Sequence, residues 1–188
     1  MFDLGDGNFG WLAAYAWNQN GKHTLRVGTY FGAIWLPPSG SEVGMILNRW
    51  YHCAITRDSN MKWSVYLDGV LQGTYTDSSW DFNTYPDRIS LGGFHNMSYT
   101  NYGVVSYISD FRFVKGVEVY TGNFTPPSGP LTTTGGTYSS TTNVTNPSSA
   151  NTLLLTAQNS SGSFVDNSQY NRTLTSYNTV TTEAGVPN

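Results

Sequence analysis

Residues 107–130, YISDFRFVKGVEVYTGNFTPPSGP, decide the fold of this chain. They begin with a strand pattern at 108–114, in which two large aromatic side chains, Phe111 and Phe113, flank a polar one. A Lys-Gly turn and a second short strand pattern at 117–120 follow. The prolines at 126–127 lack amide donors and cannot continue a central strand. The stretch therefore predicts short antiparallel strands joined by tight turns.

The rest of the chain repeats this pattern. Its 188 residues fit one all-β domain, and its aromatic content of 15% is typical of β-rich proteins. Helical periodicity is almost absent, and Gly, Asn, Asp and Ser clusters separate the apolar runs. We expect strands near 9–17, 24–30, 32–36, 43–47, 50–57, 61–67, 70–76, 88–92, 104–114, 117–120, 152–156 and 173–176.

The clearest hairpin lies at 62–75, where Asp68 and Gly69 separate two alternating segments. An Asp-Gly pair tolerates the positive φ angles of a two-residue type I′ turn. Side chains alternate between the faces of a strand, so Trp63, Val65 and Leu67 share one face. We expect this face, together with Phe111 and Phe113, to lie in the core.

Further motifs occur in a fixed order along the chain. Before the stretch 107–130, the chain contains the motifs RWYHCAITR at 49–57, KWSVYLDG at 62–69 and RISLGG at 88–93. After it, the last forty residues contain NTLLLT, FVDNS and NRTLT. In this order the motifs resemble the laminin G-like (LamG-like) branch of the concanavalin A-like lectin/glucanase superfamily, in its bacteriophage structural-protein type. The resemblance implies a two-sheet antiparallel jelly-roll sandwich made of residues 1–131 and 151–188.

Two segments depart from that family pattern. The opening strand of the family has no counterpart here, so we expect an open sheet edge near strands 152–156 and 173–176, and open edges invite strand addition. Residues 132–150, TTTGGTYSSTTNVTNPSSA, form a low-complexity polar stretch that cannot build a core. We expect a loop or extended arm that becomes ordered only on a surface.

Charge and cysteine content exclude several classes of function. Charged residues make up 11% of the chain, the net charge is −3 and there is no run of Lys or Arg, so we expect no nucleic-acid partner. Cys53 is the single cysteine, which excludes an internal disulfide, and we expect it to be a small core residue.

We find no signal-peptide pattern and no apolar stretch of membrane-spanning length, and expect synthesis in a cytoplasm.

The side chains needed for catalysis are sparse. Glucanases of the superfamily use two glutamates about 5–5.5 Å apart, whereas Glu42, Glu118 and Glu183 lie far apart in sequence. Cys53 and its neighbour His52 point to opposite faces of a strand, and none of the histidines has metal-ligand spacing. We therefore expect no enzymatic activity.

The resemblance implies two kinds of binding residue. LamG-like domains often hold one Ca²⁺ at a rim loop, and the candidates are Asp3, Asp6, Asp110 and Asp166. The alternative is that Asp166 forms a turn and Asp110 caps an edge hydrogen bond. Aromatic faces stack on sugar rings, and the loop-rich candidates, besides Trp35, are Trp80, Tyr85, Phe94, Tyr99 and Tyr102. The alternative for each of these is a core or subunit contact.

Three functions compete. The first is a non-enzymatic component of a phage virion (capsid decoration, head fibre or tail), present in many copies, bound to other virion proteins and contacting host glycans. The second is a bacterial extracellular carbohydrate-binding module. The third, a glycoside hydrolase, is disfavoured by the missing carboxylates. No cofactor other than calcium is expected, and no membrane partner.

Overall fold

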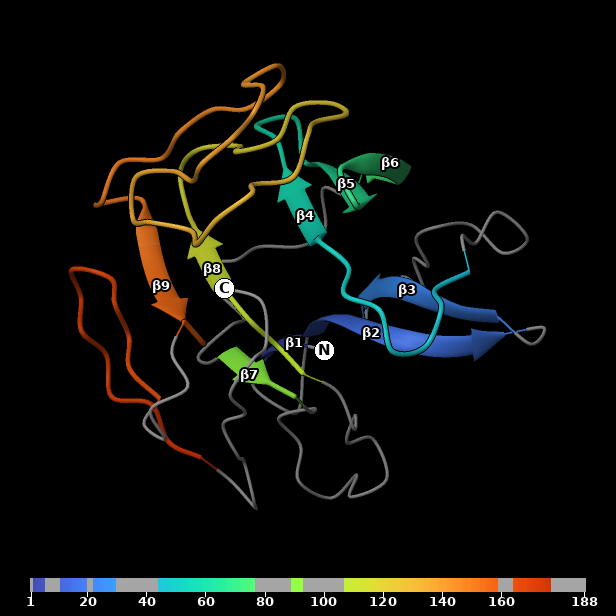
Figure 1. Ribbon diagram of the computed structural model, residues 1–188, viewed down its shortest axis with the longest axis horizontal. Coiled ribbons are helices and arrows are strands. Elements are labelled where there is room, and N and C mark those ends of the chain that lie inside the picture. Colours follow the sequence, from blue (N-terminus) through green and yellow to red (C-terminus); the bar gives the residue numbers. More distant parts are fainter. Residues whose placement is uncertain are drawn as a thin grey trace. The chain divides into compact units, whose positions relative to one another are not determined.

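The computed structural model divides the chain into two compact units, Met1–Ser106 and Tyr107–Asn188, which we treat separately (Figure 1). Side chains are described from residue 44 onward, and the first three strands are described by their backbone. The structure describes residues 2–5, 11–19, 22–29, 44–76, 89–92, 107–158 and 164–176.

The first sheet of unit 1 has four antiparallel strands in the order β3-β2-β1-β7. They are β1 (Phe2–Gly5), β2 (Trp11–Gln19), β3 (Lys22–Thr29) and β7 (Ile89–Leu91). Strand β1 lies inside the sheet, where Leu4 is opposite Leu12 on one side and Ile89 on the other. The expectation that the opening strand is missing is therefore wrong: a four-residue strand escaped notice because its FDLG sequence is too short to show a period.

The second sheet of unit 1 consists of β4 (Cys53–Arg57), β5 (Lys62–Leu67) and β6 (Val70–Thr76), with β5 in the centre. Asp68 and Gly69 have φ angles of 49° and 77°, so the expected two-residue hairpin with positive φ at both turn positions is confirmed. The second sheet therefore depends on this turn for its register.

Strand β5 forms the core of this sheet. Trp63, Val65 and Leu67 are buried as expected, with Val65 fully inaccessible. Ser64 and Tyr66, which point to the opposite face, are buried as well. Strand β5 is therefore covered on both faces, which its alternating sequence does not reveal. Cys53, expected in the core, is exposed at the start of the edge strand β4.

Unit 2 contains one antiparallel pair, β8 (Phe111–Val114) and β9 (Thr152–Thr156). Phe111 and Phe113 are half-buried rather than fully buried, because this sheet has only two strands. Three expected strands do not form: residues 44–47 and 117–120 contribute only isolated bridges, and 173–176 forms none. Propensity alone does not make a strand where no neighbouring strand is available to pair with.

Residues 132–150 form a loop that is folded onto its own unit rather than an extended arm. Its backbone exchanges hydrogen bonds with the preceding segment, from Thr145 N to Val119 O (2.8 Å) and from Ser128 N to Thr137 O (2.8 Å). Tyr138 joins an aromatic cluster in which the Tyr120 and Phe124 rings stack 3.7 Å apart, and its hydroxyl lies 3.0 Å from that of Tyr120. The surface that the loop was expected to need is supplied by residues 117–128.

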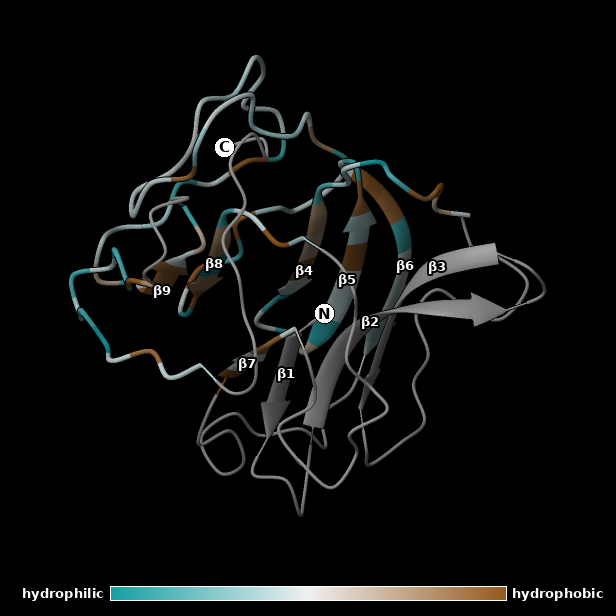
Figure 2. Cartoon of the chain, turned by 60° about the horizontal axis from the view of Figure 1, so that its bottom comes forward, coloured by the Kyte–Doolittle hydropathy of each residue, from teal (hydrophilic) through white to brown (hydrophobic). Residues whose placement is uncertain are grey.

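Strand β8 also holds this loop. The Arg112 guanidinium donates hydrogen bonds to the carbonyls of Thr132 and Gly135, which close the turn between them. The Arg112 side chain therefore fixes the turn of residues 132–135 to the strand from which it comes. Figure 2 shows the loops of unit 2 mostly in white and teal, the colours of their largely polar composition.

The expected all-β, antiparallel architecture is confirmed in the described part of the chain, where every strand pair is antiparallel and no helix occurs. The joining of 1–131 and 151–188 into one domain stays a prediction. Among the described residues no helix has the length and apolarity that crossing a bilayer requires.

We predict that Trp63→Ala lowers the free energy of unfolding by about 3–5 kcal/mol, because it leaves a large cavity beside the fully buried Val65. Val70→Ala in the same hairpin is the control, since Val70 is 53% exposed and its truncation removes little packing. Urea denaturation followed by tryptophan fluorescence and circular dichroism measures both. Equal midpoints for the two variants would contradict the core assignment.

Candidate functional site

The predicted site residues are distributed unevenly over the described structure. Asp3 lies in β1, opposite Ala13 and Ser90, and the positions of Asp110 and Asp166 are both in unit 2. The rest of the predicted set lies outside the described residues: Asp6, Trp35, Trp80, Tyr85, Phe94, Tyr99 and Tyr102.

Asp110 lies immediately before β8 with a positive φ of 54°, which aims its carboxylate back toward the loop that follows residue 130. Its Oδ1 accepts hydrogen bonds from Gln158 Nε2 (2.5 Å) and from Leu131 N (3.3 Å). Gln158 Nε2 also donates to Leu131 O (2.7 Å), and its Oε1 accepts from Asn167 Nδ2 (3.1 Å). Asp110 and Gln158 therefore tie together three segments that are distant in sequence.

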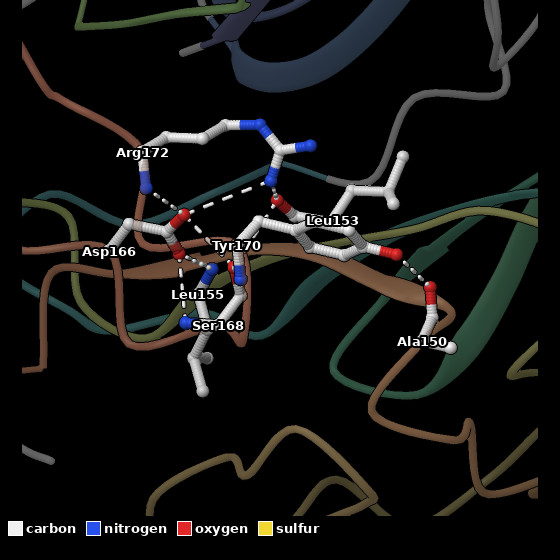
Figure 3. Close-up of polar contacts among 7 residues, drawn as sticks. All are labelled: Ala150, Leu153, Leu155, Asp166, Ser168, Tyr170 and Arg172. Carbon is white, nitrogen blue, oxygen red and sulfur yellow. Dashed lines mark hydrogen bonds and ion pairs between the residues drawn. The ribbon is translucent and has the colours of Figure 1, made fainter.

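Asp166 is 3% exposed and accepts hydrogen bonds through both carboxylate oxygens (Figure 3). Oδ1 accepts from Leu155 N (3.2 Å) and Ser168 N (2.9 Å), and Oδ2 accepts from the Ser168 hydroxyl and Arg172 N (both 2.9 Å). The Arg172 guanidinium lies 3.8 Å from Oδ2. The carboxylate therefore has neutral donors and a cation around it, which is what burying a charge requires.

These partners set the pKa of Asp166. Burial alone raises the pKa of a carboxyl, but hydrogen bonds from Arg172 N, Ser168 N, the Ser168 hydroxyl and Leu155 N outweigh burial and hold the pKa of Asp166 below its ordinary value of 3.8. The group is ionised at neutral pH. A depressed pKa stabilises the folded state above the ordinary pKa, and the contribution is lost as pH falls through the folded value.

The segment 166–172 covers the outer edge of β9, the edge that faces away from β8. Leu155 N donates to Asp166, Leu155 O accepts from Asn167 N (2.7 Å), and Leu153 O accepts from the Arg172 guanidinium. The expectation of an open edge at 152–156 is therefore wrong: side chains and backbone of the same chain occupy it. We refer to residues 166–172 as the edge cover.

Tyr170 and Arg172 complete the edge cover, and neither was singled out from the sequence. The Arg172 guanidinium lies 4.6 Å from the centroid of the Tyr170 ring, and the Tyr170 hydroxyl donates to Ala150 O (2.8 Å). One signal could have found them. No charged residue occurs between Glu118 and Asp166, so Asp166 and Arg172 are the first charges after a long neutral stretch and have each other as the nearest opposite charge in sequence.

The described residues offer calcium little. Both oxygens of Asp166 already accept from N–H and O–H donors and face a guanidinium, so this carboxylate is not a metal ligand in the present arrangement. Asp110 Oδ1 and the Leu131 carbonyl lie near each other, but both already accept from Gln158 Nε2, and Ca²⁺ takes about six to eight oxygens. Within the described part of the chain no group of three or more His, Cys, Asp or Glu side chains is placed to hold a metal. Calcium binding stays a prediction.

A neutral surface is the other distinctive feature of unit 2. Residues 119–165 contain no Asp, Glu, Lys, Arg or His. The described part of this stretch exposes Ser, Thr and Asn side chains along ordered loops, including Thr121, Thr134, Thr142 and Asn146. Hydroxyl and amide groups can donate and accept hydrogen bonds without charge, so this surface suits uncharged polar partners.

We predict that Asp166→Asn lowers the free energy of unfolding at pH 7 by about 1–3 kcal/mol, because an amide oxygen cannot replace both carboxylate oxygens as acceptors. The wild type should lose this advantage as pH falls below about 4, since the pKa is depressed, and the two curves should converge there. Asp58→Asn is the comparison: hydrogen bonds from Lys62 N and Asn60 N also lower the pKa of Asp58, but they reach a single oxygen of a turn residue, so its loss of stability at pH 7 should be the smaller of the two. Parallel stability curves for wild type and Asp166→Asn from pH 7 to pH 2.5 would refute this role.

The comparisons with known proteins agree with this architecture. The family model described as concanavalin A-like lectin/glucanases superfamily matches residues 2–118, from the first strand of unit 1 to just beyond β8. No curated protein and no solved structure matches the chain. The family match covers more than half of the chain and includes both sheets of unit 1. The chain therefore belongs to the concanavalin A-like lectin/glucanase superfamily, and its laminin G-like fold is that of a carbohydrate-binding type of domain.

Proposed function

We propose that this chain is a non-enzymatic component of a bacteriophage virion (a capsid decoration, head fibre or tail protein) that contacts neutral glycans on the host surface. The observation that carries the proposal is the ordered, charge-free surface of unit 2, which extends over 119–158 in the described structure. Close packing of many copies creates no like-charge repulsion on such a surface. A lectin-like fold and a neutral hydrogen-bonding surface together favour display and binding over chemistry.

The carboxylates support a non-enzymatic role. A retaining glycosidase needs two carboxyl groups about 5–5.5 Å apart, one as acid and one as nucleophile. In the described structure Asp166 is enclosed by donors, Asp68 is paired with Arg49, and Asp58 caps a turn. Each of these groups has a structural role that explains its presence, and Glu118 is the one glutamate within the described ranges.

The edge cover changes how an assembly would form. Strand addition at β9 would first have to displace residues 166–172, which occupy the backbone groups of Leu153 and Leu155. We therefore propose that copies meet through their neutral loop surfaces. A surface of short hydroxyl and amide side chains orders with little loss of side-chain entropy, which favours many weak, additive contacts.

A bacterial extracellular carbohydrate-binding module is the second candidate. The lectin-like fold supports it equally, and it differs in where the protein resides. Both candidates predict glycan binding, so only the location of the protein separates them.

Two measurements test the proposal. An antibody raised against the purified chain should label phage particles from cells that carry the gene, and the labelled chain should bind neutral glycans on an array. Binding should change little between about 0.15 M and 1 M salt, because no charge is involved. Cell-wall or medium location without particle labelling would favour the second candidate. Turnover of β-glucans that Glu118→Gln abolishes would overturn the non-enzymatic role.

A further inference from the structure

Unit 1 contains a pocket between the segment 44–51 and the β5–β6 hairpin, with a cavity volume of about 270 Å³. Gly44, Ile46, Arg49 and Tyr51 line it from one side. Leu67, Asp68, Val70 and Gln72 line it from the other. Ligand pockets combine apolar walls with a few placed polar groups, and this one has both.

The walls of the pocket are held in place by hydrogen bonds. The Tyr51 hydroxyl accepts from Ile46 N (2.7 Å), which closes the 46–51 loop on itself. Asp68 Oδ1 accepts from His52 N (2.9 Å), so the hairpin turn is fixed to the same loop. The Arg49 guanidinium lies 4.7 Å from the centroid of the Tyr51 ring and 3.0 Å from Asp68 Oδ2. A site with fixed walls loses little conformational entropy when a ligand binds.

The polar groups of the pocket leave a specific set of hydrogen-bonding positions. The Tyr51 oxygen accepts one bond, which leaves its O–H free to donate. Gln72 Nε2 donates to Val70 O (2.8 Å), so the Gln72 amide oxygen is directed elsewhere and is available as an acceptor. The described residues give the pocket one hydroxyl donor and one amide acceptor for a ligand.

The charges of the pocket cancel. Arg49 and Asp68 are paired, so neither selects an ion of the opposite sign. This excludes uronic and sialic acids as preferred ligands and favours an uncharged group. The apolar lining comes from Ile46, Leu67 and Val70, and two of these, Ile46 and Val70, are more than half exposed. Apolar area left open beside one donor and one acceptor suits a ligand that carries a methyl group next to an amide.

We propose that this pocket binds the acetamido group and ring of a single N-acetylhexosamine unit. The acetamido methyl contacts Ile46, Leu67 and Val70, its carbonyl accepts from the Tyr51 hydroxyl, and its N–H donates to the Gln72 amide oxygen. The cavity is slightly smaller than the range of about 300–1,000 Å³ typical of drug-sized ligands, which limits the site to one sugar unit. This inference rests on the proposed glycan-binding function and names the site and sugar class.

The test is a titration of the isotope-labelled full chain with N-acetylglucosamine and N-acetylgalactosamine, followed by amide chemical shifts. Glucose and galactose are the matched ligands without the acetamido group. We expect shifts confined to amides of 44–52 and 67–73, and affinity at least about tenfold higher for the N-acetyl sugars than for the parent sugars. Equal affinity for both classes, or shifts confined to other residues, would overturn the proposal.

Variants make the assignment specific. Val70→Trp fills the pocket, and Gln72→Leu removes the acceptor without adding bulk; both should weaken binding about tenfold or more. Leu71→Trp is the control, because Leu71 is 40% exposed, does not line the pocket and is paired with Tyr66, whereas Val70 is paired with Leu67. If Val70→Trp fails to fold, Gln72→Leu alone decides, and unchanged affinity in that variant contradicts the site.

The failure of this inference can be told apart from the failure of the proposed function. If the Val70→Trp and Gln72→Leu variants still bound glycans on the array, the sugar site would lie outside this pocket. The pocket inference would then be wrong, and the proposed function would stand. If the chain bound no glycan at all while the antibody still labelled phage particles, both the pocket inference and the glycan-binding part of the proposed function would be wrong. The virion role would stand. N-acetylhexosamine binding at the pocket without particle labelling would keep the site and favour the extracellular module.

Discussion

The buried carboxylate of Asp166 is the interaction on which unit 2 depends. Its two oxygens accept from Leu155 N, from Ser168 and from Arg172 N, and so fix the last described segment to the outer edge of β9. A two-stranded sheet has two edges and little core, so it is marginal alone. The edge cover gives β9 backbone partners on its second side. The Arg112 side chain, which comes from β8, holds the turn of residues 132–135 by donating to the Thr132 and Gly135 carbonyls.

Hydrogen bonds from polar side chains to backbone groups also explain how the long neutral segment between Glu118 and Asp166 stays ordered. With no charge between Glu118 and Asp166, the loop backbone relies on other loops and on amide and hydroxyl groups. Asn143 Nδ2 donates to Asn123 O (2.7 Å), and Asn151 Nδ2 donates to Lys115 O (3.0 Å), each across more than fifteen residues. Such bonds contribute about 0.5–1.5 kcal/mol each, so order arises from many of them together. The result is an ordered surface that keeps its neutrality, the property that the proposed function uses.

Much of the fold could be predicted from the sequence because it depends on local patterns. The Asp68-Gly69 turn and the alternation of Trp63, Val65 and Leu67 placed β5 and β6 correctly, and the family motifs predicted the superfamily. The errors concern contacts between distant segments. Nothing local in FDLG shows that β1 lies between two strands, and nothing in the low-complexity stretch 132–150 shows that residues 117–128 supply its partners.

The candidate sites were harder to predict for the same reason. Asp166 was singled out as a possible metal ligand because its residue type fits calcium, but its function follows from donors that come from β9 and from Arg172. The pocket of unit 1 depends on the meeting of 44–51 with the β5–β6 hairpin, and the sequence gives no distance between them. Family motifs identify the residues that build a fold, whereas a binding pocket arises from how those residues meet.

Amide hydrogen exchange at Leu155 tests the central claim, that Asp166 holds the edge cover over β9, most directly. In the wild type the Leu155 amide donates to Asp166 Oδ1 and should be protected, as should the Asp110 amide, which donates to Ala157 O on the β8 side. In Asp166→Ala the Leu155 amide should exchange much faster while the Asp110 amide stays protected, because only the outer edge of β9 is uncovered. Unchanged protection of Leu155 in this variant would contradict the account.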